Sequence, residues 1–294
     1  MKNSLTKDWE SVIGWPLPFE YAETYYNGVM LQLTEEKLCY VVSNGSVSLS
    51  CFFLERSKIA GERILPVLDR LALPWRWNTK RQRDSWLLCC DKVNQFEITV
   101  SGDVKQVSLP EEVLSPLDLR HLSIDPFLFD RFLIEHKGAY GFVCRDAVTK
   151  EKLWTLTAQG YLYTDMVRIG DRVLFGTAEH GGFVYCIDLP TGKIAYQINT
   201  RGTAKIQFGE GFFVCYELGK VGKLLLVETE TGQILDSAPL YKTSIKCPLF
   251  LMNNRDIFIV SFRKNGKDSS EAVLSKYSVC PGEAYRANGT VKDH

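Results

Sequence analysis

Residues 183–196 read FVYCIDLPTGKIAY, which is two alternating runs joined by the pair Thr191-Gly192. A glycine in a tight turn permits a positive φ, and alternation in the flanking runs places one face of each strand in a core. The stretch therefore predicts a β-hairpin, and its second strand ends in the aromatic residue Tyr196.

The same pattern recurs on both sides of this hairpin. Residues 144–154 read CRDAVTKEKLW, with Lys150 in place of the glycine, and residues 227–235 read VETETGQIL. Weaker copies bring the turn positions to six: 45, 102, 150, 192, 232 and 282. Successive turns are 57, 48, 42, 40 and 50 residues apart. Repeats of about 40–50 residues, each holding four strands, are typical of β-propeller blades.

We therefore predict an all-β fold, a single β-propeller over residues 1–294 with about six four-stranded blades, six or seven in all. Residues 1–28 are expected to supply a closing strand, a cap or part of a seventh blade. Residues 56–83 form an insertion, with a short helix expected near 59–74, because apolar residues recur there at helical spacing. A β-sandwich whose turns contain glycine is the alternative fold.

The strong copies resemble the repeat of the quinoprotein-type (PQQ-like) β-propellers, whose signature runs Asp-x-x-Thr-Gly-x-x-x-Trp. The matching residues are Asp146, Thr149 and Trp154 in one copy, Asp188, Thr191, Gly192 and Tyr196 in the next, and Thr231 and Gly232, after Glu228, in the third. The resemblance is clearest over about residues 140–240, and it implies that these residues make the turn and join blade to blade. Many members bind no quinone and serve as interaction platforms, so the resemblance implies architecture far more than activity, and we expect no cofactor.

Charge and cysteine usage limit the partners and the compartment. Lys+Arg and Asp+Glu both number 35, and this balance disfavours nucleic acid as the main partner, because phosphate binding requires a basic excess. The sequence has no signal-peptide pattern and no apolar run of membrane-spanning length, so we expect a cytoplasmic protein. Nine scattered cysteines without paired short spacings predict buried free thiols and no metal site.

Catalytic candidates are few. Glu179 and His180 lie in a glycine-rich loop and could perform acid–base chemistry, but a solvent-facing turn explains the same loop. The adjacent pair Cys89-Cys90 is similar to a cysteine pair beside the cofactor of some quinone-dependent enzymes. Side chains of neighbouring strand residues point to opposite faces, so two unrelated buried thiols are the preferred interpretation.

Residues 74–83 read PWRWNTKRQR and form the one basic, aromatic segment of an otherwise neutral chain. The candidate contact residues are Trp75, Arg76, Trp77, Lys80, Arg81 and Arg83. Trp and Arg dominate interface hot spots, so the segment predicts binding of another protein, one of acidic character. The alternative is that the two tryptophans cap the core while the charges are solvated.

The functional prediction is a non-catalytic, cytosolic protein-binding module: a scaffold, or an inhibitor or immunity protein that captures a partner. The alternative is an enzyme of hydrolytic or lyase type, or a small-molecule binder, which uses the central channel with Glu179 and His180 among its groups.

Overall fold

The structure, a computed structural model, describes residues 3–13, 28–34, 37–44, 48–55, 58–66, 78–90, 93–108, 126–164, 166–178, 180–202, 205–218, 221–242, 249–264 and 270–281. Every regular element in these ranges is a β-strand, so the all-β prediction is confirmed there. Over the same ranges no helix has the length and apolar character needed to cross a membrane.

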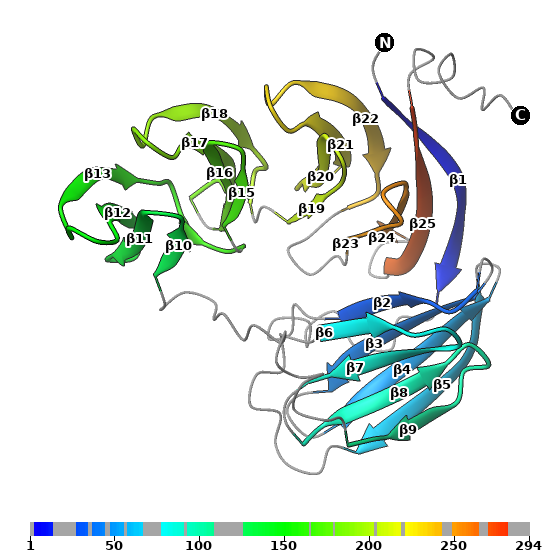
Figure 1. The fold of residues 1–294 in the computed structure, drawn as a ribbon. Coiled ribbons are helices and arrows are strands. Elements are labelled where there is room, and N and C mark those ends of the chain that lie inside the picture. The colour runs from blue at the N-terminus through cyan, green and yellow to red at the C-terminus, as the bar shows by residue number, and fades with distance from the viewer. Residues whose placement is uncertain are drawn as a thin grey trace, which may run out of the picture. The chain divides into compact units, whose positions relative to one another are not determined.

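The chain divides into two compact units. The first comprises Met1–Asp8, Arg120–Phe262 and Lys276–His294, and the second comprises Trp9–Leu119 and Arg263–Ser275. Across the described ranges the strands form six antiparallel sheets, five of four strands and one of five (Figure 1). The prediction of four-stranded units is therefore confirmed for five of these sheets, and the sixth carries one extra strand.

Three sheets of the first unit are built from strands consecutive in the chain (Figure 1). Their strands are β10 (Phe127–Phe129), β11 (Phe132–Lys137), β12 (Gly141–Asp146) and β13 (Lys152–Thr157); β14 (Tyr161–Leu162), β15 (Val167–Ile169), β16 (Arg172–Ala178), β17 (Phe183–Asp188) and β18 (Ile194–Asn199); and β19 (Ile206–Phe208), β20 (Phe212–Glu217), β21 (Gly222–Glu228) and β22 (Ile234–Leu240). In the middle sheet both β14 and β15 pair with β16.

A fourth sheet joins the two ends of the described chain. It runs in the order β1-β25-β24-β23, so the first strand lies beside the last and takes the outer edge (Figure 1). The strands are β1 (Ser4–Ile13), β23 (Leu249–Met252), β24 (Asp256–Lys264) and β25 (Ser270–Cys280). Both units contribute residues to β1, β24 and β25.

The second unit contains two further sheets. Their strands are β2 (Gly28–Gln32), β3 (Lys37–Asn44), β4 (Ser48–Glu55) and β5 (Lys58–Pro66), followed by β6 (Asn78–Arg81), β7 (Ser85–Cys89), β8 (Gln95–Thr99) and β9 (Val104–Gln106). One buried cluster, with Leu31, Cys51 and Phe53 from the first sheet and Leu88 and Phe96 from the second, packs them together.

Side-chain alternation explains how neighbouring sheets of the first unit pack. On β16 and β17, Val173, Phe175 and Tyr185 join a cluster with the β10–β13 sheet, whereas Leu174 and Cys186 join a cluster with the β19–β22 sheet. Successive strand residues point to opposite faces, so this sheet buries both faces. Such a strand is apolar throughout, as the run FVYCI at residues 183–187 shows.

Four of the six predicted turns, at 102, 150, 192 and 232, lie between the third and fourth strands of their sheets. The other two do not. Residue 45 lies outside the described residues, between β3 and β4, the second and third strands of their sheet. Residue 282 is likewise outside them and follows β25, whose outer neighbour is β1.

A repeated shift in strand register identifies the connection in the β2–β5 sheet that is equivalent to the turns at 150, 192 and 232. The register between the third and fourth strands shifts just before the turn at four places: Phe53/Leu54, Cys144/Arg145, Cys186/Ile187 and Leu226/Val227. The connection from β4 to β5 therefore corresponds in position to those at 150, 192 and 232. A glycine between alternating runs marks a hairpin but does not say which hairpin of the sheet it is.

The predicted helix near 59–74 is wrong over residues 59–66, which belong to β5 and pair with β4. Residues 67–74 lie outside the described part of the chain. The apolar pair Ile64-Leu65 is too short to distinguish a helical period from a strand period. Pro66 fits the strand because β5 is an edge strand, where a missing N–H removes no ladder hydrogen bond.

Candidate interaction surface and polar sites

The basic segment is described from residue 78 onward, where Arg81 is the best-anchored side chain. Its guanidinium donates to the carbonyl oxygens of Gln32 (3.1 Å) and Leu33 (3.4 Å) and lies 5.3 Å from the ring centroid of Trp86. Trp86 Nε1 donates to the same Gln32 carbonyl at 2.8 Å. Arg81 and Trp86 therefore fix β6 and β7 against the end of β2, and Arg81 serves the fold.

Lys80 and Arg83 flank Arg81 and are exposed. The turn that carries Arg83 is closed by a hydrogen bond from the Gln82 amide to the Ser85 carbonyl (2.8 Å) and by one from Ser85 Oγ to Gln82 Oε1. Two positive side chains therefore stand on a backbone that the sheet holds in place. Trp75, Arg76 and Trp77 lie outside the described residues.

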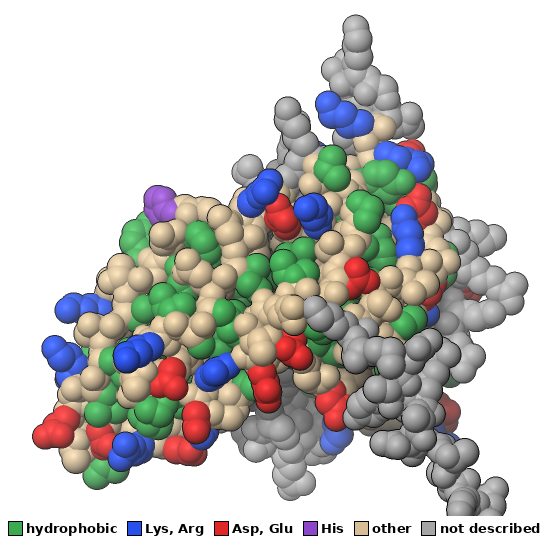
Figure 2. Space-filling model, turned by 90° about the horizontal axis from the view of Figure 1, so that it is seen from above, with side chains coloured by type: hydrophobic (Ala, Val, Ile, Leu, Met, Phe, Trp, Pro, Cys, Tyr) green, Lys and Arg blue, Asp and Glu red, His purple; other side chains and the backbone are tan. Residues whose placement is uncertain are grey.

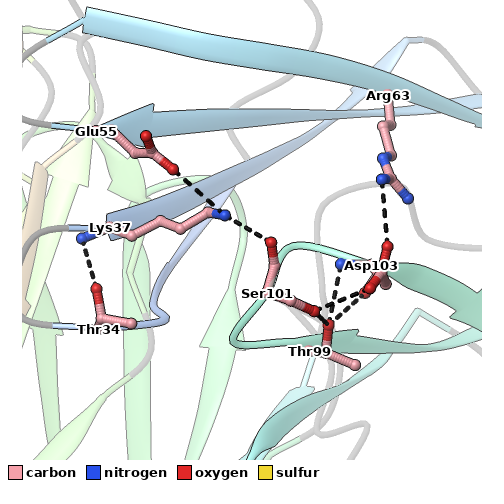
Figure 3. A network of polar contacts seen from close by, with 7 residues as sticks. All are labelled: Thr34, Lys37, Glu55, Arg63, Thr99, Ser101 and Asp103. Atoms are coloured by element: carbon pink, nitrogen blue, oxygen red, sulfur yellow. Dashed lines mark hydrogen bonds and ion pairs between the residues drawn. The ribbon is translucent and has the colours of Figure 1, made fainter.

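A polar network in the second unit was not predicted (Figure 3). Lys37 Nζ donates to the Ser101 carbonyl at 2.6 Å, lies 3.4 Å from Glu55 Oε1 and stands 5.5 Å from the Phe53 ring centroid. The Lys37 amide donates to Thr34 Oγ1 at 3.0 Å. These contacts join the β2–β5 sheet to the β8–β9 turn.

The β8–β9 turn is itself closed by side chains. Thr99 Oγ1 lies 2.6 Å from Ser101 Oγ, which also donates to Asp103 Oδ2 at 2.9 Å (Figure 3). Arg63 Nη2 lies 3.4 Å from Asp103 Oδ1. Gly102 carries φ +96°, and a Cβ there would lie 3.0 Å from Lys37 Nζ and 3.2 Å from Phe53. The neighbouring sheet thus covers the turn with Lys37 and Phe53.

In the first unit the repeat-turn residues close their turns in one common way. Asp188 Oδ1 accepts hydrogen bonds from the amide (3.0 Å) and hydroxyl (2.6 Å) of Thr191. Asp146 Oδ1 accepts from the amides of Val148 (2.9 Å) and Thr149 (3.0 Å), and these bonds lower the pKa of Asp146. The third copy has the longer Glu228, whose carboxylate the Thr231 hydroxyl reaches.

Residues 150, 192 and 232 all adopt a left-handed backbone, with φ of 63°, 69° and 71°. Each donates its amide to the carbonyl of the acidic residue that opens the turn, at 2.8–2.9 Å. Lys150 takes this conformation although it carries a Cβ, and it is exposed. Lysine in place of glycine at position 150 therefore leaves the backbone conformation of the turn the same as in the other two copies.

In the first two copies the aromatic residue reaches the turn of the next sheet. Trp154 Nε1 donates to the Leu189 carbonyl at 2.7 Å, and its ring covers Gly192. Tyr196 Oη donates to the Thr229 carbonyl at 2.6 Å, and its ring covers Gly232. Burial raises the pKa of Tyr196, so the phenol stays neutral and remains a donor.

Asp236 occupies the aromatic position of the third copy and makes a different contact. Its Oδ2 accepts a hydrogen bond from the backbone amide of Leu5 at 2.7 Å. Leu5 lies in β1, the strand that completes the next sheet. The departure from the aromatic pattern at residue 236 thus coincides with the place where the neighbouring outer strand comes from the start of the chain.

His180 belongs to the β16–β17 hairpin and is exposed, with φ +45°. Its Nε2 lies 3.1 Å from Tyr140 Oη, and the two rings meet edge-on with centroids 5.3 Å apart. Tyr140 comes from the β11–β12 hairpin of the preceding sheet. Glu179, the other predicted catalytic candidate, lies outside the described residues. The partner that the structure gives His180 is Tyr140, which the sequence analysis did not select.

The cysteines within the described residues are free thiols. All are buried except Cys280, which is half-buried, and both Cys89 and Cys90 are buried, so the interpretation as buried thiols is confirmed for these residues. Burial raises the pKa of Cys144 to about 11 and that of Cys215 to about 12. Thiolates are the reactive form, so these groups are inert at neutral pH. Cys247 lies outside the described ranges.

Among the described residues, no group of three or more His, Cys, Asp or Glu side chains is placed to hold a metal ion. Figure 2 shows positive and negative side chains interspersed on the face that it draws, with apolar side chains between them. A mixed surface of this kind supplies no field of one sign on that face.

Comparison with known proteins gave structural neighbours only; no family model and no curated protein matches the chain. BamB from Moraxella catarrhalis has a TM-score of 0.34 at 14% identity, covering 85% of this chain and 71% of that chain. The WD40 domain of Toxoplasma gondii coronin has 0.36 at 9%, covering 95% and 87%. The computationally designed Ika4 protein has 0.35 at 16%, covering 52% and 92%. TM-scores this low carry no argument about this chain's fold or function.

Proposed function

We propose that this chain is a cytosolic β-propeller of about six blades that binds another protein without catalysing a reaction. The packing of consecutive sheets and the pairing of β1 with β25 support the ring, because a strand from the start of the chain completes the sheet that the last strands begin. The side-chain contacts within the turns, and those from Trp154 and Tyr196 to the next turn, support a PQQ-like repeat in this chain. A scaffold and an inhibitor or immunity protein are the two forms of the proposed role.

The observation that carries the binding role is the contrast among three neighbouring basic residues. All three side chains are exposed, but the Arg81 guanidinium is held by the Gln32 and Leu33 carbonyls and serves the fold, which leaves Lys80 and Arg83 to meet a partner. Side chains that stand on a fixed backbone lose less entropy on binding than side chains of a mobile loop. The contact surface therefore comprises Lys80 and Arg83 together with Trp75, Arg76 and Trp77, and it favours a partner with acidic side chains.

Affinity capture from a lysate of the native cell, followed by binding measurements with the identified partner, tests this role. Lys80→Glu with Arg83→Glu should weaken binding at least tenfold and reduce its salt dependence, because charge complementarity governs association. Lys152→Glu with Lys193→Glu is the matched control, since both lysines are exposed, Lys152 at the start of β13 and Lys193 directly before β18. Equal losses in the two variants would remove the surface from consideration.

Replacing Trp75, Arg76 and Trp77 with alanine tests the aromatic part of the same surface. Capture should be abolished while the melting temperature stays within a few degrees of wild type, because hot-spot residues carry most of the binding energy. Unchanged capture would exclude this segment. A large fall in melting temperature would instead support the alternative in which the two tryptophans cap the core.

A second candidate function rests on the contact between His180 and Tyr140. A histidine hydrogen-bonded to a phenol is a pairing that can hold or transfer a proton in a small-molecule site. Thermal-shift screening of metabolites tests it: a compound that stabilises the wild type, but neither His180→Ala nor Tyr140→Phe, would support this candidate. Equal stabilisation of all three proteins would exclude the pair as the site.

A further inference from the structure

β1 is the outermost strand of its sheet, and polar contacts fix it to the neighbouring strands. No residue from Asn3 to Val12 is fully buried. In contrast β25, its neighbour, buries apolar side chains that include Val273, Leu274 and Tyr277. Burial of apolar surface is the main force that fixes a strand in place, so β1 depends on its polar contacts more than its neighbour does.

In the first unit these contacts centre on Asp8. Its Oδ2 accepts a hydrogen bond from Ser278 Oγ at 2.6 Å and lies 3.3 Å from Lys276 Nζ. Lys276 Nζ also lies 3.2 Å from Asp256 Oδ1, so the lysine bridges a carboxylate of β1 and one of β24. Burial alone would lower the pKa of Lys276, but the hydrogen bonds and charges of Asp256 and Asp8 outweigh it and raise that pKa.

Further polar contacts follow the same strand. The Leu5 amide donates to Asp236, and Lys7 Nζ stands 5.8 and 5.9 Å from the ring centroids of Tyr241 and Tyr277. In the second unit Glu10 lies 3.9 Å from Arg263, which also pairs with Glu271. Lys276 on β25 and Arg263 on β24 thus offer positive charge to Asp8 and Glu10. Asp236 on β22 offers an acceptor to the Leu5 amide.

From these contacts we propose that β1 is an exchangeable strand: β1 of one copy of this chain occupies the edge of β25 in a second copy. A second copy carries the same carboxylates at positions 8 and 10 and the same amide at position 5, so each polar contact is re-formed in the exchanged pair. Exchange of an identical element is a low-cost route to dimers, and its extent depends on concentration. This inference is independent of the contact surface proposed above.

Thr6 provides a direct test, because its Oγ1 lies 3.4 Å from Cys280 Sγ across β1 and β25. The full chain with Thr6→Cys is incubated at about 5, 50 and 500 µM, since exchange depends on concentration. It is then oxidised with diamide, which takes up the two thiol hydrogens as the disulfide forms. Denaturing electrophoresis without reductant and peptide mass spectrometry locate the disulfide between positions 6 and 280. The double variant Thr6→Cys, Cys280→Ser is the control for other thiols.

Exchange predicts that the link occurs in covalent dimers whose ratio to linked monomers rises about tenfold for each tenfold rise in concentration, while dimers are the minority. The link in monomers alone at every concentration would overturn the proposal. Failure of the link to form in either species would also contradict it, because exchange requires β1 to lie beside β25.

A second experiment uses charge reversal and needs no cross-link. Asp8→Lys and Lys276→Asp each place like charges across β1 and β25, so each variant alone should expose the strand and show faster amide exchange over residues 4–13. Mixing the two variants lets β1 of the Asp8→Lys chain meet β25 of the Lys276→Asp chain, which restores opposite charges across the two strands. Native mass spectrometry should then show the mixed dimer in at least fivefold excess over either homodimer. The 1:2:1 ratio of homodimer, mixed dimer and homodimer that random pairing gives, or monomers alone, would contradict strand exchange.

Discussion

Gly192 lies directly beneath the indole ring of Trp154: a Cβ placed on residue 192 would sit 2.5 Å from Cδ2 of the tryptophan. The same relationship holds in the next pair of sheets, where a Cβ on Gly232 would lie 2.4 Å from Cδ2 of Tyr196. The aromatic ring of one sheet therefore requires a glycine in the turn of the next. The turn motif fixes both the hairpin and the spacing between sheets.

The first prediction compares two glycines with similar backbones. Gly192→Ala should lower the free energy of unfolding by about 2–4 kcal/mol, because the new methyl group meets both a left-handed backbone (φ +69°) and the Trp154 ring. Gly170→Ala should cost only about 1 kcal/mol, because φ is +58° but nothing lies within 4 Å. Urea unfolding at pH 7 measures both values, and equal losses would show that the ring contact carries no energy.

The second prediction concerns the hydrogen bond in this contact. Tyr196→Phe keeps the ring over Gly232 but removes the donor to the Thr229 carbonyl, so it should cost about 1 kcal/mol. Tyr140→Phe is the matched control, since its partner His180 is exposed, and it should cost under about 0.5 kcal/mol. A loss no larger at Tyr196 than at Tyr140 would show that Thr229 finds another donor.

Much of this arrangement could be predicted from the sequence because it is local. The Asp188–Thr191–Gly192 turn joins residues at most four positions apart, and the alternation of FVYCI gives a strand buried on both faces. A turn and a strand period are properties of short windows. The predicted hairpin over residues 183–196 is therefore confirmed, with β17 and β18 on the two sides of the Thr191-Gly192 turn.

The remaining features depend on residues far apart in the chain. Lys37 reaches Ser101 across 64 positions, and no local pattern marks a lysine that caps a distant turn. Arg81 carried a signal for function, a basic aromatic segment, yet tertiary contacts place it on the carbonyls of Gln32 and Leu33. Among these long-range contacts, that of Asp236 is the exception that the sequence could have indicated, since a carboxylate at an aromatic position of the repeat points to a different neighbour.

The third prediction follows from that exception. Asp236→Trp restores the aromatic residue of the repeat, yet it should destabilise the protein by about 1 kcal/mol and speed amide exchange at Leu5, because the Leu5 N–H loses its acceptor. Asp236→Asn keeps a side-chain oxygen and should have a smaller effect on both measurements. Stabilisation by tryptophan would mean that the ring finds a partner like Gly192, and the explanation of this departure would fail.

The last prediction concerns acid sensitivity at His136 on β11. Its Nε2 is buried without a hydrogen-bond partner, its ring lies 5.1 Å from that of Phe142, and burial lowers its pKa from the ordinary 6.5. Well above pH 6.5 the histidine is neutral in both the folded and the unfolded chain, so it makes no pH-dependent contribution. Below pH 6.5 the unfolded chain binds a proton that the folded chain does not, and stability falls until the folded-state pKa is passed.

This loss can be separated from that of the carboxylates. Hydrogen bonds lower the pKa values of Glu97 and Asp146 below 4.5 and 3.8, so their stabilisation is lost only in more acidic solution. Between about pH 7.5 and 5 the melting temperature of the wild type should therefore fall, and His136→Phe should flatten that slope because phenylalanine binds no proton. His180→Gln, at an exposed histidine, is the control and should keep the wild-type slope. An unchanged slope in His136→Phe would show that water reaches Nε2 in the folded protein and that protonation there carries no penalty.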